Sequence, residues 1–211
     1  METERLIRTL ALDAPRAAPM GRAWAVALAA ALAGAAIVFF SVVGPRPDIA
    51  AAAETWRFLY KFVVTIALLA ASLWALAALA RPGGMSPARL AALLVAPCLL
   101  AASVLIEVAA LPSDQLGPRL LGNNALLCLT FIPLIGVGPA AAFLLALRHG
   151  APTSPALAGA VAGLAAGGLA ATFYAAHCTD DSPLFVATWY PMAIAILAAA
   201  GAAAGRLVIR W

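Results

Sequence analysis

The sequence predicts an all-α integral membrane protein with six transmembrane helices, and two observations carry that prediction. Of the 211 residues, 65% are apolar and 10% are charged, whereas an average soluble domain has about 45–50% and about 25%. Uncharged apolar runs of about 20 residues, long enough to cross the hydrocarbon layer of a bilayer, occur six times. So few charges cannot cover a soluble protein of this size, and such high hydrophobicity excludes intrinsic disorder. A soluble enzyme is therefore not expected.

The six runs follow one another with short polar segments between them. They cover residues 23–43, 62–80, 90–106, 125–147, 155–176 and 184–205. The third is short and reaches an adequate length if it continues to Leu111. No intervening segment is long enough for a soluble domain, so residues 23–211 are predicted to form one membrane domain of three helical hairpins, preceded by a cytoplasmic segment over residues 1–22.

The first run is predicted to stay in the protein as a membrane span. A cleaved signal peptide is the alternative, but its apolar region is usually about 7–15 residues long. Here the run has 21 residues, and three acidic residues precede it. Retention as the first helix therefore fits better.

The basic residues predict the orientation, because cytoplasmic loops carry an excess of Lys and Arg. Nine bases fall on the side of the two termini and four on the other side. The nine are Arg5, Arg8, Arg16, Arg22, Arg81, Arg89, Arg148, Arg206 and Arg210; the four are Arg46, Arg57, Lys61 and Arg119. Both termini are thus expected in the cytoplasm. These bases are too few and too scattered for nucleic-acid binding.

The last two spans carry small residues at helical spacing. Gly159, Gly163 and Gly167 lie four residues apart, and Gly201 and Gly205 repeat the spacing. Such spacing lets two helix backbones approach closely in lipid. An alanine-rich composition would also scatter small residues, but close packing of these two helices is the better prediction.

Two ionisable residues lie near the outer ends of spans. Lys61 starts the second span and Glu107 ends the third. Long side chains at such positions can reach water, so structural anchoring is expected rather than a proton or ion path. The spans contain no paired carboxylates and no Ser/His pair, so an enzyme is not expected.

The cysteines are more informative. The topology puts Cys128 and Cys178 on the same, non-cytoplasmic face, whereas Cys98 is mid-span and expected to be inert packing. His177 precedes Cys178, and Asp180 and Asp181 follow it. This set could bind a soft metal ion or undergo thiol oxidation; a plain disulfide and unpaired thiols are the alternatives. There is no C-x-x-C, which argues against a thiol oxidoreductase.

The N-terminal segment carries a short apolar stripe. Leu6, Ile7 and Leu10 fall on one helix face. A helix of about eleven residues is marginal in water by itself. It could lie on the lipid surface or dock into the groove of a partner.

Several strings resemble one known family. Residues 177–185 read HCTDDSPLF, residues 189–190 read WY, and the chain closes with Arg210 and Trp211. Residues 6–11 read LIRTLA, and Asp13 follows. Together these strings, with six spans and a matching length over the whole chain, resemble the NrsF-type anti-sigma factors, negative regulators of sigma F. Arg16 departs from the pattern, which expects an apolar residue there.

The resemblance implies a function without enzymatic activity. Members of the family are bacterial inner-membrane proteins that hold an ECF-type sigma factor at the membrane and release it under heavy-metal or oxidative stress. It implies Cys128 and Cys178 as the sensing pair and the stripe of Leu6, Ile7 and Leu10 as the sigma contact. No obligatory cofactor is implied; a soft metal ion would act as a signal. The rival interpretation is a small membrane transporter or metal exporter, which would need polar residues deep in several spans.

Overall fold

The computed structural model describes residues 2–13 and 20–209, and within them the chain is helical with no strand. Six stretches are long and apolar enough to cross a membrane, which confirms the predicted number. Their helices are α2 (Met20–Val38) with the π-helical turn η1 (Phe39–Val43), α4 (Trp56–Leu79), α5 (Pro87–Ala92) with α6 (Val95–Ala110), α7 (Ser113–Leu121) with α8 (Ala125–Leu147), α9 (Pro155–Ala175) and α10 (Pro183–Val208). The remaining helices are α1 (Glu2–Asp13) and α3 (Ile49–Ala52).

Two spans differ from the predicted bounds for local reasons. Helix α4 begins at Trp56, where the Thr55 hydroxyl accepts a hydrogen bond from the Phe58 amide at 3.4 Å as an N-cap. The third span is two helices, because α5 ends at Ala92 and α6 starts at Val95. Pro97 has no amide hydrogen to donate back along the helix, which accounts for a break one turn before it.

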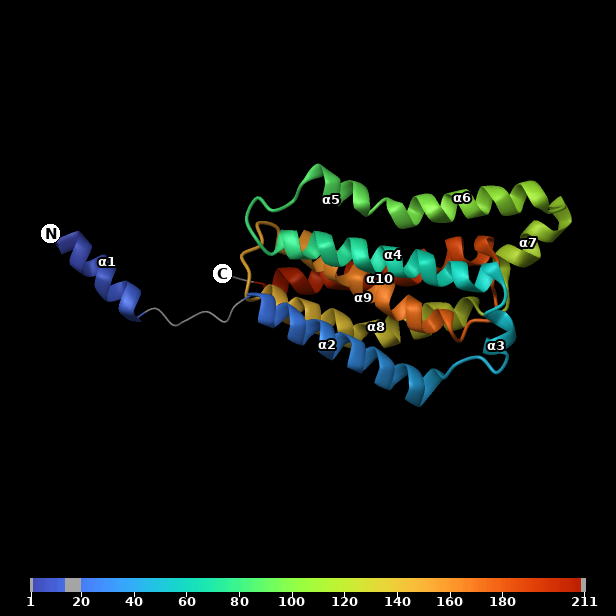
Figure 1. The fold of residues 1–211 in the computed structure, drawn as a ribbon, viewed down its shortest axis with the longest axis horizontal. Helices are drawn as coiled ribbons and strands as arrows, with labels where there is room; N and C mark the ends of the chain where they lie inside the picture. The colour runs from blue at the N-terminus through green and yellow to red at the C-terminus, as the bar shows by residue number, and fades with distance from the viewer. Residues whose placement is uncertain (1, 14–19, 210–211) are drawn as a thin grey trace.

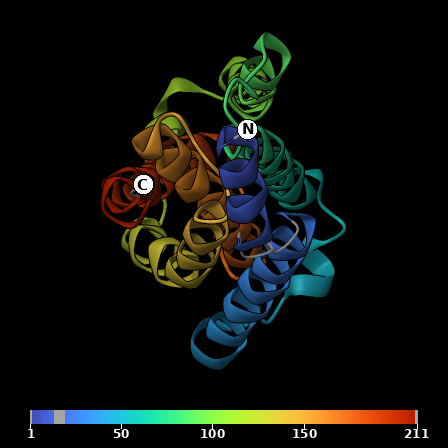
Figure 2. The same ribbon diagram turned by 90° about the vertical axis from the view of Figure 1, so that its left-hand side faces the viewer.

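Helix α9 lies at the centre of the bundle and packs against α10, α4 and α8. Helix α2 packs chiefly on α8, and α6 lies at the edge of the bundle, where it packs chiefly against α4 and α10 (Figures 1 and 2). The first two predicted hairpins are therefore not packed pairs, since the main neighbours of α2 and α6 are not the next helices along the chain. The third pair, α9 with α10, packs as predicted.

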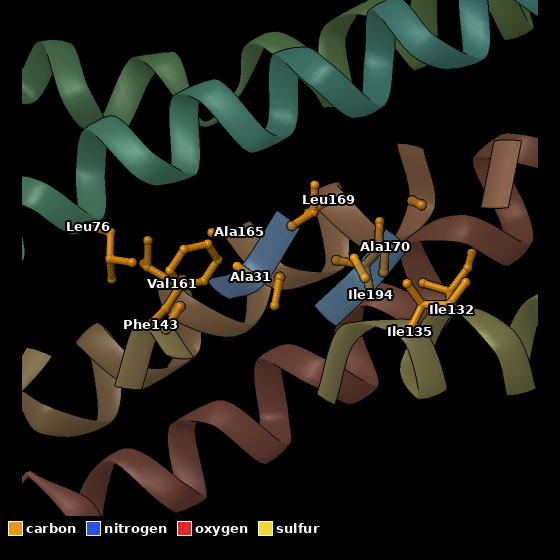
Figure 3. Packing of buried hydrophobic residues seen from close by; sticks show 14 of the residues in the cluster. Ala31, Leu76, Ile132, Ile135, Phe143, Val161, Ala165, Leu169, Ala170 and Ile194 are labelled. Carbon is orange, nitrogen blue, oxygen red and sulfur yellow. The ribbon is translucent and has the colours of Figure 1, made fainter. Parts of the chain in front are cut away.

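The interface of α9 and α10 depends on small residues. A Cβ atom added at Gly159 would collide with the carbonyl oxygen of Gly201, and one added at Gly201 would collide with that of Gly159. Gly163 approaches the Leu197 carbonyl in the same way. Further along α9, Ala165, Leu169 and Ala170 line the core that Figure 3 shows. The glycine spacing thus predicted the helix–helix contact correctly.

The bundle has two distinct ends. The start of α2 and the end of α10 lie at one end, and α3 and α7 lie at the other, which we call the distal end (Figure 1). Helix α1 stands clear of the bundle beyond the first end. Its Leu6 and Ile7 side chains are 59% and 61% exposed, whereas the side chain of Leu10 is outside what the structure describes.

Candidate functional site

The two predicted sensor cysteines meet at the distal end. Cys128 is in the first turn of α8, where its amide donates to the Asn124 carbonyl at 2.8 Å. Cys178 lies in the segment of residues 176–182 that joins α9 to α10, here called the Cys178 loop. Both cysteines are free and 0% exposed, and the two thiols interact directly. Fifty residues of chain thus separate two side chains that share one buried pocket.

The electrostatics of the pair favour Cys178 as the thiolate. A hydrogen bond from the Cys128 thiol lowers the pKa of Cys178, and the Lys61 ammonium lowers it further, against the opposing effect of burial. The Cys178 Sγ atom also lies 3.7 Å from the Asp180 carbonyl oxygen. Because the thiolate is the reactive form of cysteine, this environment favours Cys178 as the more readily ionised thiol of the pair.

Two cations hold the backbone of the Cys178 loop. Lys61 Nζ donates to the Cys178 carbonyl at 2.8 Å and pairs with Asp181 Oδ1 at 2.5 Å. Arg46 Nη1 reaches the same carbonyl at 3.3 Å and Asp181 Oδ2 at 2.9 Å. Lys61 is 1% exposed. The expectation that Lys61 reaches water is therefore wrong: its amine turns inward because a carbonyl and a carboxylate meet it there.

Arg46 extends this cluster to the distal surface. Its guanidinium makes two further hydrogen bonds to Asp48, both of 2.7 Å. These bonds and the nearby Asp181 raise the pKa of Arg46, and the guanidinium lowers the pKa of Asp48. Both groups thus stay charged over the physiological range, and Asp181 keeps two cationic partners.

Asp180 ties the Cys178 loop to the helix that carries Cys128. Its Oδ2 atom accepts hydrogen bonds from the amides of Asn123 and Asn124 at 2.9 and 2.8 Å, and from Asn124 Nδ2 at 2.8 Å. These donors belong to the start of α8, where backbone amides are unpaired and a negative charge is favourable. Gly122 makes room for this contact, with a φ of 57° and no space for a Cβ beside Asp180.

Glu107 likewise accepts hydrogen bonds at the start of a helix, in this case α10. Its Oε2 atom accepts from the Ser182 hydroxyl at 2.8 Å and from the Leu184 amide at 3.1 Å. Its Oε1 atom pairs with Arg119 at 3.3 Å and Arg57 at 3.5 Å. Glu107 is 2% exposed, so the expectation that it reaches water is also wrong. Glu107, a residue of α6, therefore caps the start of α10.

The other predicted ligands do not converge on the thiols. His177 Nδ1 donates to the Gly44 carbonyl at 2.9 Å, Asp180 caps α8, and Asp181 pairs with Lys61 and Arg46. Across the described part of the chain, no group of three or more His, Cys, Asp or Glu side chains is arranged to hold a metal ion. The residues therefore fit a bond between two thiols, or a soft metal held by two sulfurs, better than a full coordination shell.

Two tyrosines that the sequence analysis did not assign flank the thiols. The hydroxyl of Tyr174 lies beside Cys128, and that of Tyr190 lies beside Cys178. Both hydroxyls are buried, and neither has a hydrogen-bond partner of normal geometry among the described residues. Tyr174 lies four residues before Cys178, a spacing that could have indicated that it lies near the thiol pair. Cys98, by contrast, is exposed on the surface of α6 and does not pack inside the bundle as expected.

Comparison with known proteins gives a consistent result. The sequence profile of the NrsF family, described as negative regulator of sigma F, matches residues 10–211. A protein of Caulobacter vibrioides named "Anti-sigma-F factor NrsF" is 35% identical over 217 residues, and one of Azospira oryzae named "Probable anti-sigma-F factor NrsF" is 33% identical over 219 residues. Each alignment covers 100% of both chains. No solved structure has significant similarity to this chain.

Proposed function

The chain belongs to the NrsF family of negative regulators of sigma F, and from this premise we propose that it is a membrane-bound anti-sigma factor. It holds an ECF-type sigma factor at the cytoplasmic face of the bacterial inner membrane. It releases this partner when a soft metal ion or an oxidant reacts with Cys128 and Cys178. The protein performs no enzymatic step.

The observation that carries the proposal is the buried thiol pair and its connections. The Cys178 loop is bonded to α4 through Lys61, to the start of α8 through Asp180, and to the segment after η1 through Arg46. Its last residue, Ser182, is bonded to Glu107 of α6. A new bond at Cys178 therefore displaces a loop that contacts several spans. Release requires a coupling of only about 1–3 kcal/mol between the two sites.

Helix α1 supports the binding half of the proposal. It stands clear of the bundle at the end where α2 begins and α10 ends (Figure 1), and the base count assigns that end to the cytoplasm. Leu6 and Ile7 are exposed on it. An apolar stripe on a free helix suits a groove on the sigma factor.

Transport receives no support from the structure. A transporter needs polar residues at the depth of its substrate path. The buried Asp, Glu, Lys and Arg side chains among the described residues are Arg46, Lys61 and Glu107, and all three take part in the distal loop network.

The test is co-purification of the sigma factor with variants of the full chain. The Cys128→Ser/Cys178→Ser double variant should still bind the sigma factor but no longer release it on exposure to cadmium or an oxidant. Cys98→Ser, at an exposed position on α6, serves as the matched control and should respond normally. Normal release from the double variant would show that the sensor lies elsewhere.

A further inference from the structure

The Cys178 loop is hydrogen-bonded to the segment of chain that follows α2 and η1. His177, the residue before Cys178, donates from Nδ1 to the Gly44 carbonyl at 2.9 Å. The Arg46 amide donates to the Ala176 carbonyl at 3.0 Å, and the Arg46 guanidinium reaches the Cys178 carbonyl at 3.3 Å. A displacement of Cys178 is therefore passed directly to the distal end of α2.

The last turn of this span, η1, has two possible hydrogen-bond registers. In the π-helical turn the Gly44 amide donates to the Phe39 carbonyl at 2.7 Å, whereas an α-helix would give the same amide to the Phe40 carbonyl. The next residue, Pro45, has no amide hydrogen, so these two carbonyls compete for the Gly44 amide. Turns of this type are rare and are frequent at functional sites. The two registers differ by one residue.

The packed face of α2 permits a shift of that size. The buried residues of α2 are Ala27, Ala31 and Ala35, and Figure 3 shows Ala31 within the core. The helix packs chiefly on α8, which carries Cys128. A face of small side chains opposes sliding less than a face of large interdigitating ones. One residue of register corresponds to about 1.5 Å along the helix axis, and helix shifts of about 1–2 Å are common in allosteric transitions.

The other spans bonded to the Cys178 loop are less free to move. The carbonyls of Gly159 and Gly201 hold α9 and α10 in close backbone contact, and α4 packs along α9. Helix α2 lies at the edge of the bundle, chiefly against one neighbour (Figure 1). It also leads to α1, with residues 14–19 between the two helices. A shift of α2 therefore moves the point from which α1 is tethered.

We propose that η1 is the two-state element of the sensor and that α2 carries the signal from the thiols to α1. In the resting chain, His177 and Arg46 hold the segment after η1 so that the Gly44 amide bonds to Phe39. When a metal ion or an oxidant joins the two thiols, the Cys178 loop moves and this hold is lost. The Gly44 amide then bonds to Phe40, η1 becomes α-helical, and α2 shifts along α8. The inference rests on the proposed function, for which it names the path of the signal.

The first measurement follows α2 directly, in the full chain in lipid nanodiscs. Azide-bearing amino acids at Val26 of α2 and Leu207 of α10, both exposed positions, carry spin labels without adding thiols. Their separation is measured before and after cadmium, which bridges the two sulfurs as the thiol protons leave to water. Thiolate–cadmium absorbance in the ultraviolet confirms that the metal is bound.

The separation between Val26 and Leu207 should change by about 1.5 Å or more when cadmium binds. Labels at Leu145 of α8, also exposed, and Leu207 form the matched pair without α2, and their separation should stay constant. An unchanged distance from α2 in the cadmium-bound chain would overturn the inference.

The second measurement removes the alternative register. Deleting Ser41, an exposed residue of η1, takes out the extra residue of the π-helical turn, so the turn should be α-helical while the segment after it keeps its partners. Cadmium should weaken sigma binding about fivefold or more in the native chain and leave it unchanged in the shortened one. Ser41→Ala keeps the residue count and is the matched control, with a native response. Normal release from the shortened chain would overturn the inference, and the label distances decide it if that chain does not fold.

The third measurement tests the hold on η1 without any metal. His177→Phe keeps a ring beside Phe131 and Tyr174 but removes the hydrogen bond to the segment after η1. Thr179→Val removes a hydrogen bond from the same loop to Asn124, just before α8. Loss of one net hydrogen bond should weaken resting sigma binding about fivefold in His177→Phe and leave it unchanged in Thr179→Val. Equal affinities in the two variants would overturn the inference.

The label distances and the release of the sigma factor separate this inference from the proposed function. Movement of α2 on cadmium binding without release of the sigma factor would contradict the proposed function and support the helix shift. Release without movement of α2 would support the proposed function and overturn the helix shift.

Discussion

At the scale of single residues, Lys61 organises the site. Its amine contacts the carbonyl of Cys178 and the carboxylate of Asp181 from a position that is 1% exposed. A buried charge is costly unless it is paired and hydrogen-bonded, and here both conditions are met. The same charge favours the Cys178 thiolate. One residue therefore fixes the loop and sets the reactivity of the thiol.

The first prediction concerns that reactivity. Because Lys61 lowers the pKa of Cys178, Lys61→Met should raise it, so less thiolate is present at any given pH. The pH midpoint of Cys178 alkylation, measured in a Cys98→Ser background, should move upward, and Lys61→Arg should restore part of the shift. Arg57→Met removes a positive charge from the same helix at a residue that pairs with Glu107 instead, and should leave the midpoint in place. An unchanged midpoint in Lys61→Met would contradict this role.

At the scale of helices, close backbone approach holds α9 against α10. The carbonyls of Gly159 and Gly201 each occupy the space that a Cβ on the other would need. Membrane helices gain little from burying apolar surface against one another, so packing of this kind carries much of their association. The central position of α9 makes this interface important for the whole bundle.

Gly201→Ala should accordingly destabilise the protein. Overpacking of this kind costs about 1–3 kcal/mol, and here the clash is with backbone, which cannot turn aside. Gly138→Ala is the matched control, because α8 leaves open space around Gly138 and alanine favours helix over glycine. Thermal unfolding in detergent should show a lower midpoint for Gly201→Ala and an equal or higher one for Gly138→Ala. Equal midpoints for the two variants would show that the contact is dispensable.

Helix α1 gives a prediction at the same scale. Changing Leu6, Ile7 and Leu10 together to Ala should abolish sigma binding without removing the protein from the membrane. Buried apolar anchors in such interfaces often contribute about 2 kcal/mol or more each. Co-purification measures the binding, and Thr3→Ala, an exposed polar position on the same helix, is the control. Full binding by the triple variant would assign α1 to the lipid surface instead.

At the scale of the whole molecule, the sequence predicted the number of membrane spans but said less about which residues of the spans pack against one another. Apolar length predicted six spans, because a bilayer sets that length. It could not predict that Cys98 is exposed, since a lipid-facing side is as apolar as a buried one. It also missed the inward turn of Lys61, whose partner carbonyl is 117 residues away in the chain. The sequence could place Cys128 and Cys178 on the same side of the membrane, because the order of the spans alone determines the side on which each residue lies.

The last prediction concerns orientation. An even number of spans returns the chain to the side where it began, and the start of α2 and the end of α10 share one end of the bundle (Figure 1). Nine bases against four predict that this end is cytoplasmic. Reporter fusions at Met1 and Trp211 should therefore both give a cytoplasmic signal, whereas a fusion after Ala53, in the distal segment before α4, should give a periplasmic one. A periplasmic signal from one terminus alone would reject the six-span topology. A periplasmic signal from both would place the thiol pair on the cytoplasmic side, where a reducing environment would keep it from forming a lasting disulfide.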